Sequence, residues 1–161
     1  MPNREEEYLQ LEKLFAALKD EPRATLIEIK AKIEQKNSVE LQLLLGIGEA
    51  YLWNYTKAQE ILVPALKHAV RRNIQFATGL AFDELAGSYL IKSDVNAAMQ
   101  TWLKSLAYAI SHHDLNQQLR ANLGIGKVYY CIEDYKNAKK YHLAATESCF
   151  LSKSINYFSE V

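Results

Sequence analysis

Four histidines are the side chains best suited to acid–base or metal chemistry in this chain of 161 residues. His112 and His113 are adjacent, so on a helix their side chains diverge by about 100° and cannot share one metal ion. His142 is expected to be a packed core residue and His68 to be exposed. The sequence has no His-Glu-x-x-His motif and no grouping of a nucleophile with a base. We therefore predict no catalytic residue and no metal ligand.

Two short glycine motifs resemble fragments of a phosphate-binding loop. They are Gly46-Ile-Gly48 and Gly124-Ile-Gly126. A dinucleotide-binding loop needs a preceding strand and a third glycine, and neither motif has them. Both motifs lie inside helical patterns, where small residues let two helices approach closely. We interpret them as packing sites and predict no cofactor.

Charge and composition argue against several classes of partner. Lys and Arg total 19, as do Asp and Glu, so the net charge is +0, whereas a nucleic-acid-binding protein carries a basic excess or a basic stripe. No stretch approaches the ~18 consecutive apolar residues of a transmembrane helix, so membrane insertion is not expected. The N-terminus lacks the order of a signal peptide, and Cys131 and Cys149 are expected to be buried, reduced thiols. These observations predict a cytoplasmic protein.

Apolar residues recur at helical spacing along almost the whole chain, which predicts an all-α protein. Pro22 suits the first turn of a helix, and Ser38 is expected to be an N-cap. Pro64 lies inside an expected helix and should kink it. The expected helices cover residues 5–18, 22–35, 39–53, 55–72, 75–92, 95–112, 114–132 and 135–152, and a further helix is expected to begin at Ile155.

A sequence repeat with a period of about forty residues groups these helices into hairpins. Ala58, Ala98 and Ala138 each follow a short polar turn. Upstream of each turn a small residue lies three positions before a tyrosine: Gly48 before Tyr51, Ala86 before Tyr89, and Gly126 before Tyr129. On this alignment the first repeat is two residues shorter than the others between its tyrosine and its alanine. Repetition at such a period is typical of stacked helical repeats.

These recurring small and aromatic residues resemble a tetratricopeptide repeat (TPR) array, with a period of forty rather than the usual thirty-four residues. The resemblance covers about residues 39–152 and implies a right-handed α-solenoid of antiparallel helical hairpins. We divide the chain into a degenerate helical pair at residues 1–37, three TPR-like repeats at 38–153, and the start of a further, truncated helix at 154–161.

In TPR proteins the first helix of each repeat lines a concave groove that binds a partner. When the groove positions of the TPR repeat are mapped onto the aligned repeats of this chain, the residues expected to line the groove are Gln42, Leu45, Glu49, Leu52 and Trp53 in the first repeat, Asp83, Leu90 and Ile91 in the second, and Arg120, Leu123, Lys127 and Tyr130 in the third. The Lys and Asn clamp of carboxylate-binding TPR cochaperones is absent from these positions. Their mixed apolar and charged character suits a helix or an amphipathic peptide. Trp53 is the residue best placed for a contact, because it lies near a turn and outside the core pattern of the repeat.

The resemblance implies a non-enzymatic protein- or peptide-binding module. It is similar to the sensory or regulatory parts that precede output domains in bacterial signalling proteins such as diguanylate cyclases. The chain ends inside a helical pattern, which favours an N-terminal piece of a longer protein. Two alternatives remain open. One is a small stand-alone TPR chaperone that holds a secreted or assembling client, and the other is a scaffold that forms a homodimer through its exposed last helix.

Overall fold

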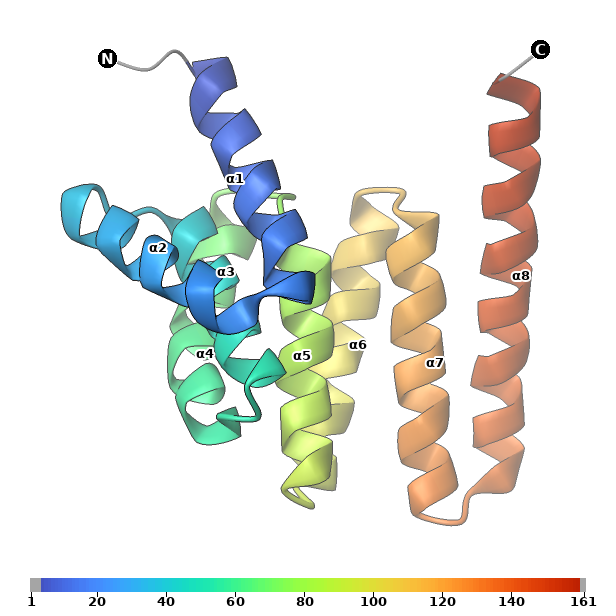
Figure 1. Cartoon of the computed structure of the whole chain (residues 1–161). Coiled ribbons are helices and arrows are strands. Elements are labelled where there is room, and N and C mark those ends of the chain that lie inside the picture. The colour runs from blue at the N-terminus through green and yellow to red at the C-terminus, as the bar shows by residue number, and fades with distance from the viewer. Residues whose placement is uncertain (1–3, 160–161) are drawn as a thin grey trace. The chain divides into compact units, whose positions relative to one another are not determined.

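The computed structural model describes the backbone of residues 4–159 and the side chains of residues 5–153 (Figure 1). These residues form eight α-helices and no strand, which confirms the all-α prediction for the described part of the chain. The chain divides into two compact units, residues 1–88 and 89–161, and α5 (Thr78–Ile91) passes from the first into the second. The right-handed solenoid concerns the arrangement of repeats over the whole chain, and it stays a prediction.

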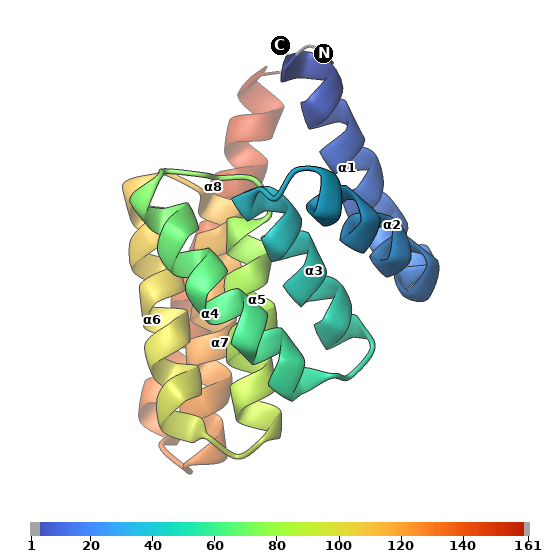
Figure 2. The same cartoon turned by 90° about the vertical axis from the view of Figure 1, so that its left-hand side faces the viewer.

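In the first unit, α3 is the central helix. It is surrounded by α1, α2 and α4, which all pack against it (Figure 2). Leu43, Leu44 and Ile47 of α3 are fully buried, as expected for a helix that is apolar on every side. The helices of this unit that precede α5 are α1 (Arg4–Asp20), α2 (Pro22–Gln35), α3 (Val39–Tyr51) and α4 (Tyr55–Arg71).

Helices α2 and α3 begin where Pro22 and Ser38 predict them to begin. Pro22 is the first residue of α2, a position where its missing N–H costs no hydrogen bond. Ser38 is the N-cap of α3, and its Oγ accepts a hydrogen bond from the Leu41 amide at 3.2 Å. Both starts therefore follow from single side chains.

The start of α5 differs from the prediction by three residues. The helix begins at Thr78 rather than at residue 75, after Ala77 with a φ of 55°. Phe76 packs edge-on against Tyr8 and Phe15 of α1, with ring centroids 5.9 and 5.8 Å apart. This aromatic cluster competes with the first turn of the helix and holds α1 against the loop.

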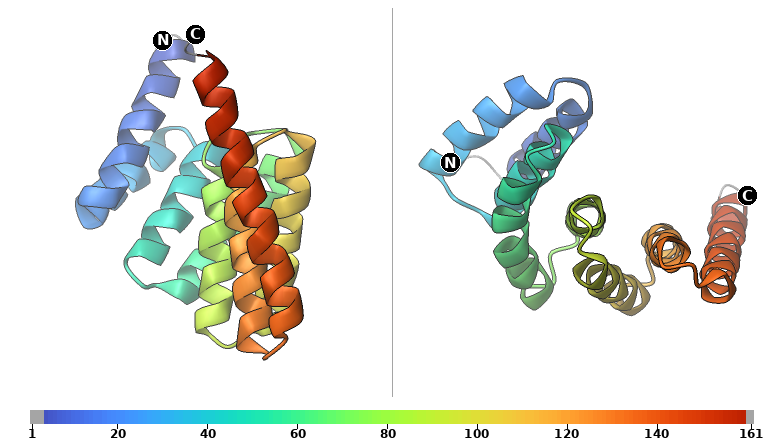
Figure 3. Two further views of the ribbon diagram at one scale, coloured as in Figure 1. Left: turned by 90° about the vertical axis from the view of Figure 1, so that its right-hand side faces the viewer. Right: turned by 90° about the horizontal axis from the view of Figure 1, so that it is seen from below.

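In the second unit, α7 (Leu115–Cys131) lies between α6 (Val95–Ser111) and α8 (Tyr135–Ser159) and packs against both (Figure 3). Trp102 of α6 and Ile125 and Val128 of α7 are buried and form its core. Helix α8 continues without a break to Ser159, so the prediction of a further helix beginning at Ile155, within the segment 154–161, is wrong. The sequence has no glycine or proline there to end a helix; residues 160–161 lie outside the described part.

Three further residues of the second unit are less buried than predicted. His142 and Cys131 are exposed, and Cys149 is half-buried. Among the described residues, α7 is the helix that packs on α8, so much of the circumference of α8 faces solvent. Both cysteines are free thiols.

The interpretation of the glycine motifs as packing sites is confirmed. A Cβ atom at Gly46 would overlap Leu62 of α4, and one at Gly124 would overlap the ring of Trp102. A Cβ atom at Gly48 would lie 2.8 Å from Leu18. Each of these glycines therefore lets a neighbouring helix approach more closely than a side chain would allow.

Candidate partner-binding surface

The three turns that join the helices of the predicted hairpins have the same backbone geometry. In each turn one residue has a positive φ: Trp53 at 64°, Ser93 at 62° and Glu133 at 62°. The amide of the next residue donates a hydrogen bond of 2.9 Å to the carbonyl five positions back, from Asn54 to Glu49, from Asp94 to Tyr89, and from Asp134 to Tyr129. Equivalent atoms therefore recur at a spacing of forty residues in all three turns.

This geometry corrects the alignment of the first repeat. The counterpart of Tyr89 and Tyr129 is Glu49, and not Tyr51 as the sequence alignment assumed. The first repeat is not shorter than the others, and its small packing residue is Gly46. The alignment failed because it matched residue types, and at this position the first repeat carries a carboxylate in place of a tyrosine.

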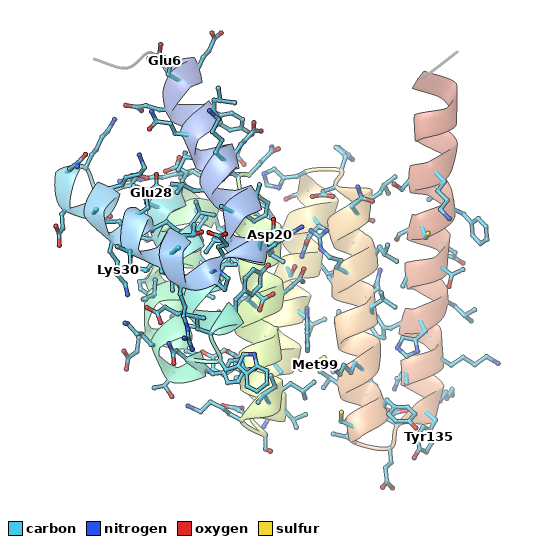
Figure 4. All side chains as sticks on the ribbon, in the orientation of Figure 1. Glu6, Asp20, Glu28, Lys30, Met99 and Tyr135 are labelled. Carbon is cyan, nitrogen blue, oxygen red and sulfur yellow. The ribbon has the colours of Figure 1, made fainter. Side chains whose placement is uncertain are left out.

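Glu49 is the centre of a charged cluster that joins three helices. It is 2% exposed, and its Oε1 lies 3.2 Å from Lys30 Nζ of α2 and 2.9 Å from Lys57 Nζ of α4. Its Oε2 accepts a hydrogen bond from Asn54 Nδ2 at 2.8 Å. Burial alone would raise the pKa of Glu49, but the ammonium groups of Lys57 and Lys30 and the hydrogen bond from Asn54 together outweigh it, and the pKa is lowered. Figure 4 shows Lys30 projecting from α2. Glu49 holds the first unit together, so its assignment to an open groove is wrong.

The face of α3 that was expected to line the groove is partly covered. Gln42, Leu45 and Leu52 are half-buried. In the corrected register the positions equivalent to Leu123 and Tyr130 of α7 are Leu43 and Ala50, which are 0% and 3% exposed. The packing of α1 and α2 on α3 accounts for this burial.

The predicted residues of α7 form one open face. Arg120, Leu123, Lys127 and Tyr130 follow a spacing of three, four and three residues, so they lie on one side of the helix. All four are exposed, Leu123 by 46% and Tyr130 by 61%. The ring of Tyr130 contacts Tyr135 edge-on, with ring centroids 5.4 Å apart. Tyr135, labelled in Figure 4, is the first residue of α8. On this face two cations, Arg120 and Lys127, alternate with two apolar side chains, Leu123 and Tyr130.

The predicted residues of α5 are less uniform. Asp83 and Leu90 are half-buried, and Ile91 is 61% exposed. Burial, and then the negative charge of Asp83, raise the pKa of Glu84 to about 7. Burial and the charge of Glu84 in turn raise the pKa of Tyr51. This part of α5 is therefore a place where a carboxyl group holds a proton near neutral pH.

Trp53 is the most exposed large apolar residue of the described chain, at 79%. Its φ of 64° is in the left-handed region, which costs a bulky residue more than it costs Asn or Gly. The equivalent turns use Ser93 and Glu133, so the fold itself does not need an indole at this place. Trp53 is therefore exposed, and its role as a contact residue stays a prediction.

The structure also contains a cavity that sequence reasoning missed. It lies between the start of α3 and the length of α4, has a volume of about 440 Å³, and is lined in part by Glu60, His68 and Arg72. The signal was present in the sequence, because Glu60, Pro64, His68 and Arg72 recur every four residues and so share one ridge of a helix.

Comparisons with known proteins give no relative for this chain. No family model, no curated protein and no solved structure matches it. Within the described residues, no group of three His, Cys, Asp or Glu side chains is placed to hold a metal ion. No helix in that part of the chain combines the length and the hydropathy that crossing a bilayer requires.

Proposed function

We propose that this protein is a non-enzymatic module that binds another protein or a peptide, and that Trp53 is a central contact. The single observation that carries the proposal is the 79% exposure of Trp53 at a turn where the equivalent residues are Ser93 and Glu133. Tryptophan is among the residues that contribute most to the free energy of protein–protein binding. An exposed indole that the fold does not use is well suited to such a contact.

The surroundings of Trp53 support this role. The neighbouring Asn54 is held by its hydrogen bond to the buried Glu49, so the turn is anchored to the core of the first unit. A rigid turn that presents an aromatic side chain loses little conformational entropy when a partner binds. The open face of α7, with Leu123 and Tyr130, is a second surface of the same character.

The resemblance to TPR sensors suggests a cellular role. We propose that the module acts in the cytoplasm as the sensory or regulatory part of a larger signalling protein, and that its partner is neither nucleic acid nor membrane. One observation favours a second candidate, self-association through α8. Leu143, Phe150 and Leu151 of that helix are 54%, 68% and 56% exposed.

A comparison of two variants tests the proposal. A displayed library of random peptides is selected on the wild-type protein, and the enriched peptides are titrated against Trp53→Ala and against Ile27→Ala. Ile27 of α2 is 73% exposed and serves as the matched control. We expect Trp53→Ala to weaken binding at least tenfold, a change of about 1.4 kcal/mol, and Ile27→Ala to leave it unchanged.

Fluorescence provides an independent measurement, because Trp102 is 6% exposed and its emission should not respond to a peptide at the surface. Binding at the proposed site should shift the emission of Trp53 to shorter wavelength, and this shift should be absent in Trp53→Ala. Peptides that bind equally well to the wild-type protein and to Trp53→Ala would refute the proposed contact.

A further inference from the structure

The cavity between α3 and α4 has an apolar floor and charged ends. Its volume of about 440 Å³ is within the range of small-ligand pockets. The floor is formed by Val39, Ile61, Pro64 and Ala65. Along α4, the carboxylate of Glu60 lies towards one end, and the side chains of His68 and Arg72 lie towards the other.

The polar side chains at the two ends of this cavity are not used by the fold. Among the described residues, none forms an ion pair or a side-chain hydrogen bond with Glu60, His68 or Arg72. Glu60 and Arg72 carry opposite charges on one ridge of the helix and do not pair with each other. Both charges therefore remain available to a ligand.

The same positions in the other repeats are occupied by internal contacts. Forty residues after His68 and Arg72 are Tyr108 and His112, whose rings lie 4.0 Å apart, centroid to centroid. A further forty residues along, Ser152 contacts Asn116, with 3.1 Å between Ser152 Oγ and Asn116 Oδ1. The first repeat thus differs from the others where the cavity lies.

Pro64 removes one backbone donor from the wall of the cavity. Because proline has no N–H, the carbonyl oxygen of Glu60 lacks the donor that an α-helix supplies four residues later. Glu60 and Pro64 both line the cavity. The wall therefore combines a backbone carbonyl that has lost its usual helical donor with the carboxylate of the same residue.

We propose that this cavity binds a short peptide with both termini free. The ammonium group of the peptide lies near Glu60, its apolar side chains lie over Val39, Ile61 and Ala65, and its carboxylate lies near His68 and Arg72. From Glu60 the rise of the helix is about 12 Å to His68 and about 18 Å to Arg72. An extended chain covers these distances with about four to five residues. The site is separate from Trp53, which does not line the cavity.

The test uses one tetrapeptide in three forms. Alanyl-leucyl-leucyl-alanine with free termini, its N-acetylated form and its C-terminal amide are titrated into the full chain by calorimetry, and binding is mapped by NMR chemical shifts. We expect the free form to bind saturably, and each blocked form to bind about fivefold more weakly, as loss of one exposed ion pair would cause.

Matched variants locate the two charged ends. Arg72→Gln should weaken binding of the free peptide about fivefold and leave binding of the amide unchanged. Arg71→Gln removes the same charge from the neighbouring residue, which does not line the cavity, and should have no effect. At the other end, Glu60→Gln should affect the free form and not the acetylated form, with Glu34→Gln as its control.

Three results would overturn the proposal: no saturable binding, equal binding of the free and the amidated peptide, or equal effects of Arg71→Gln and Arg72→Gln. All four residues are exposed, so the variants should fold, which circular dichroism would verify. Because Trp53 is outside the cavity, Trp53→Ala should bind the tetrapeptide normally. Failure of this site therefore leaves the proposed Trp53 contact standing, and the converse also holds.

Discussion

Two carboxyl groups of the first unit, the buried Glu49 and the half-buried Glu84, have pKa values displaced in opposite directions, and this opposition makes a prediction at the residue scale. Glu49 is stabilised in its charged form by Lys57, Asn54 and Lys30. Glu84 is stabilised in its protonated form by burial and by the charge of Asp83. The same substitution, Glu to Gln, should therefore change the free energy of unfolding with opposite sign at the two places.

The dependence on pH follows from the two displacements. The pKa of Glu84 is raised from 4.5 to about 7, so its contribution to stability is complete below pH 4.5 and is lost as the pH rises through about 7. The pKa of Glu49 is lowered, so its contribution is present above 4.5 and is lost as the pH falls through its folded value.

Near pH 8 we expect Glu84→Gln to stabilise the protein by about 1 kcal/mol, a value reduced because Glu84 is only half-buried. At the same pH Glu49→Gln should destabilise it by about 1–2 kcal/mol, through the loss of charged hydrogen bonds. Urea denaturation followed by circular dichroism measures both values. A change of the same sign for both variants would contradict the assigned environments.

At the scale of the helix, Gly87 and Gly124 form a matched pair, because both lie inside helices and only one is at a helix–helix contact. A Cβ atom at Gly87 of α5 would have nothing within 4 Å, whereas one at Gly124 of α7 would overlap the ring of Trp102. Gly87→Ala should stabilise the protein by about 0.5–1 kcal/mol, because alanine lowers the entropy of the unfolded chain. Gly124→Ala should destabilise it by about 1–3 kcal/mol, because α6 and α7 must move apart. Thermal denaturation compares the two, and equal effects would show that the close packing of α6 and α7 does not depend on Gly124.

Most helices could be predicted from the sequence because their signals are local. Periodic apolar residues, Pro22 and the Ser38 cap act within a few residues, and the helix boundaries they predict lie close to those observed. The start of α5 could not be predicted, since it depends on the contact of Phe76 with two rings of α1, more than sixty residues earlier in the chain. The continuity of α8 was missed for another reason: the expected turn at 153–154 was inferred from the period of the repeat and had no helix-breaking residue to support it.

At the scale of the whole molecule, the sequence predicted the candidate site only in part. The exposure of Trp53 and of the α7 face follows from the turn signals and the helical period. The face of α3 was assigned in the wrong register, because Glu49 replaces the tyrosine that marks the other repeats. The burial of Glu49 and its two lysine partners depend on how α2 and α4 pack, so they could not be recognised from the sequence. The cavity was missed because most of its lining residues are on α4 and at its C-cap and the facing wall comes from the start of α3, which the sequence alone does not place opposite them.

The balance of charge over the whole chain leads to a prediction about self-association. The net charge is +0 and the isoelectric point is about 6.9, so near neutral pH two copies do not repel each other. Helix α8 meanwhile exposes Leu143, Phe150 and Leu151 by more than half of their surface. One helical face buries less area than a stable dimer needs, so the association should be weak, with a dissociation constant of about 0.1–1 mM.

Sedimentation velocity between about 10 µM and about 1 mM protein should therefore show a rise in the mean sedimentation coefficient with concentration. The rise should be largest near pH 7 and smaller two pH units above it, where like charges accumulate. Phe150→Ser should reduce the rise by removing the most exposed apolar side chain among the described residues of α8, whereas Ile27→Ser, at a similarly exposed residue of α2, should not. A sedimentation coefficient that does not depend on concentration, or an equal response of the two variants, would exclude α8 as a self-association surface and leave its apolar face to a different partner.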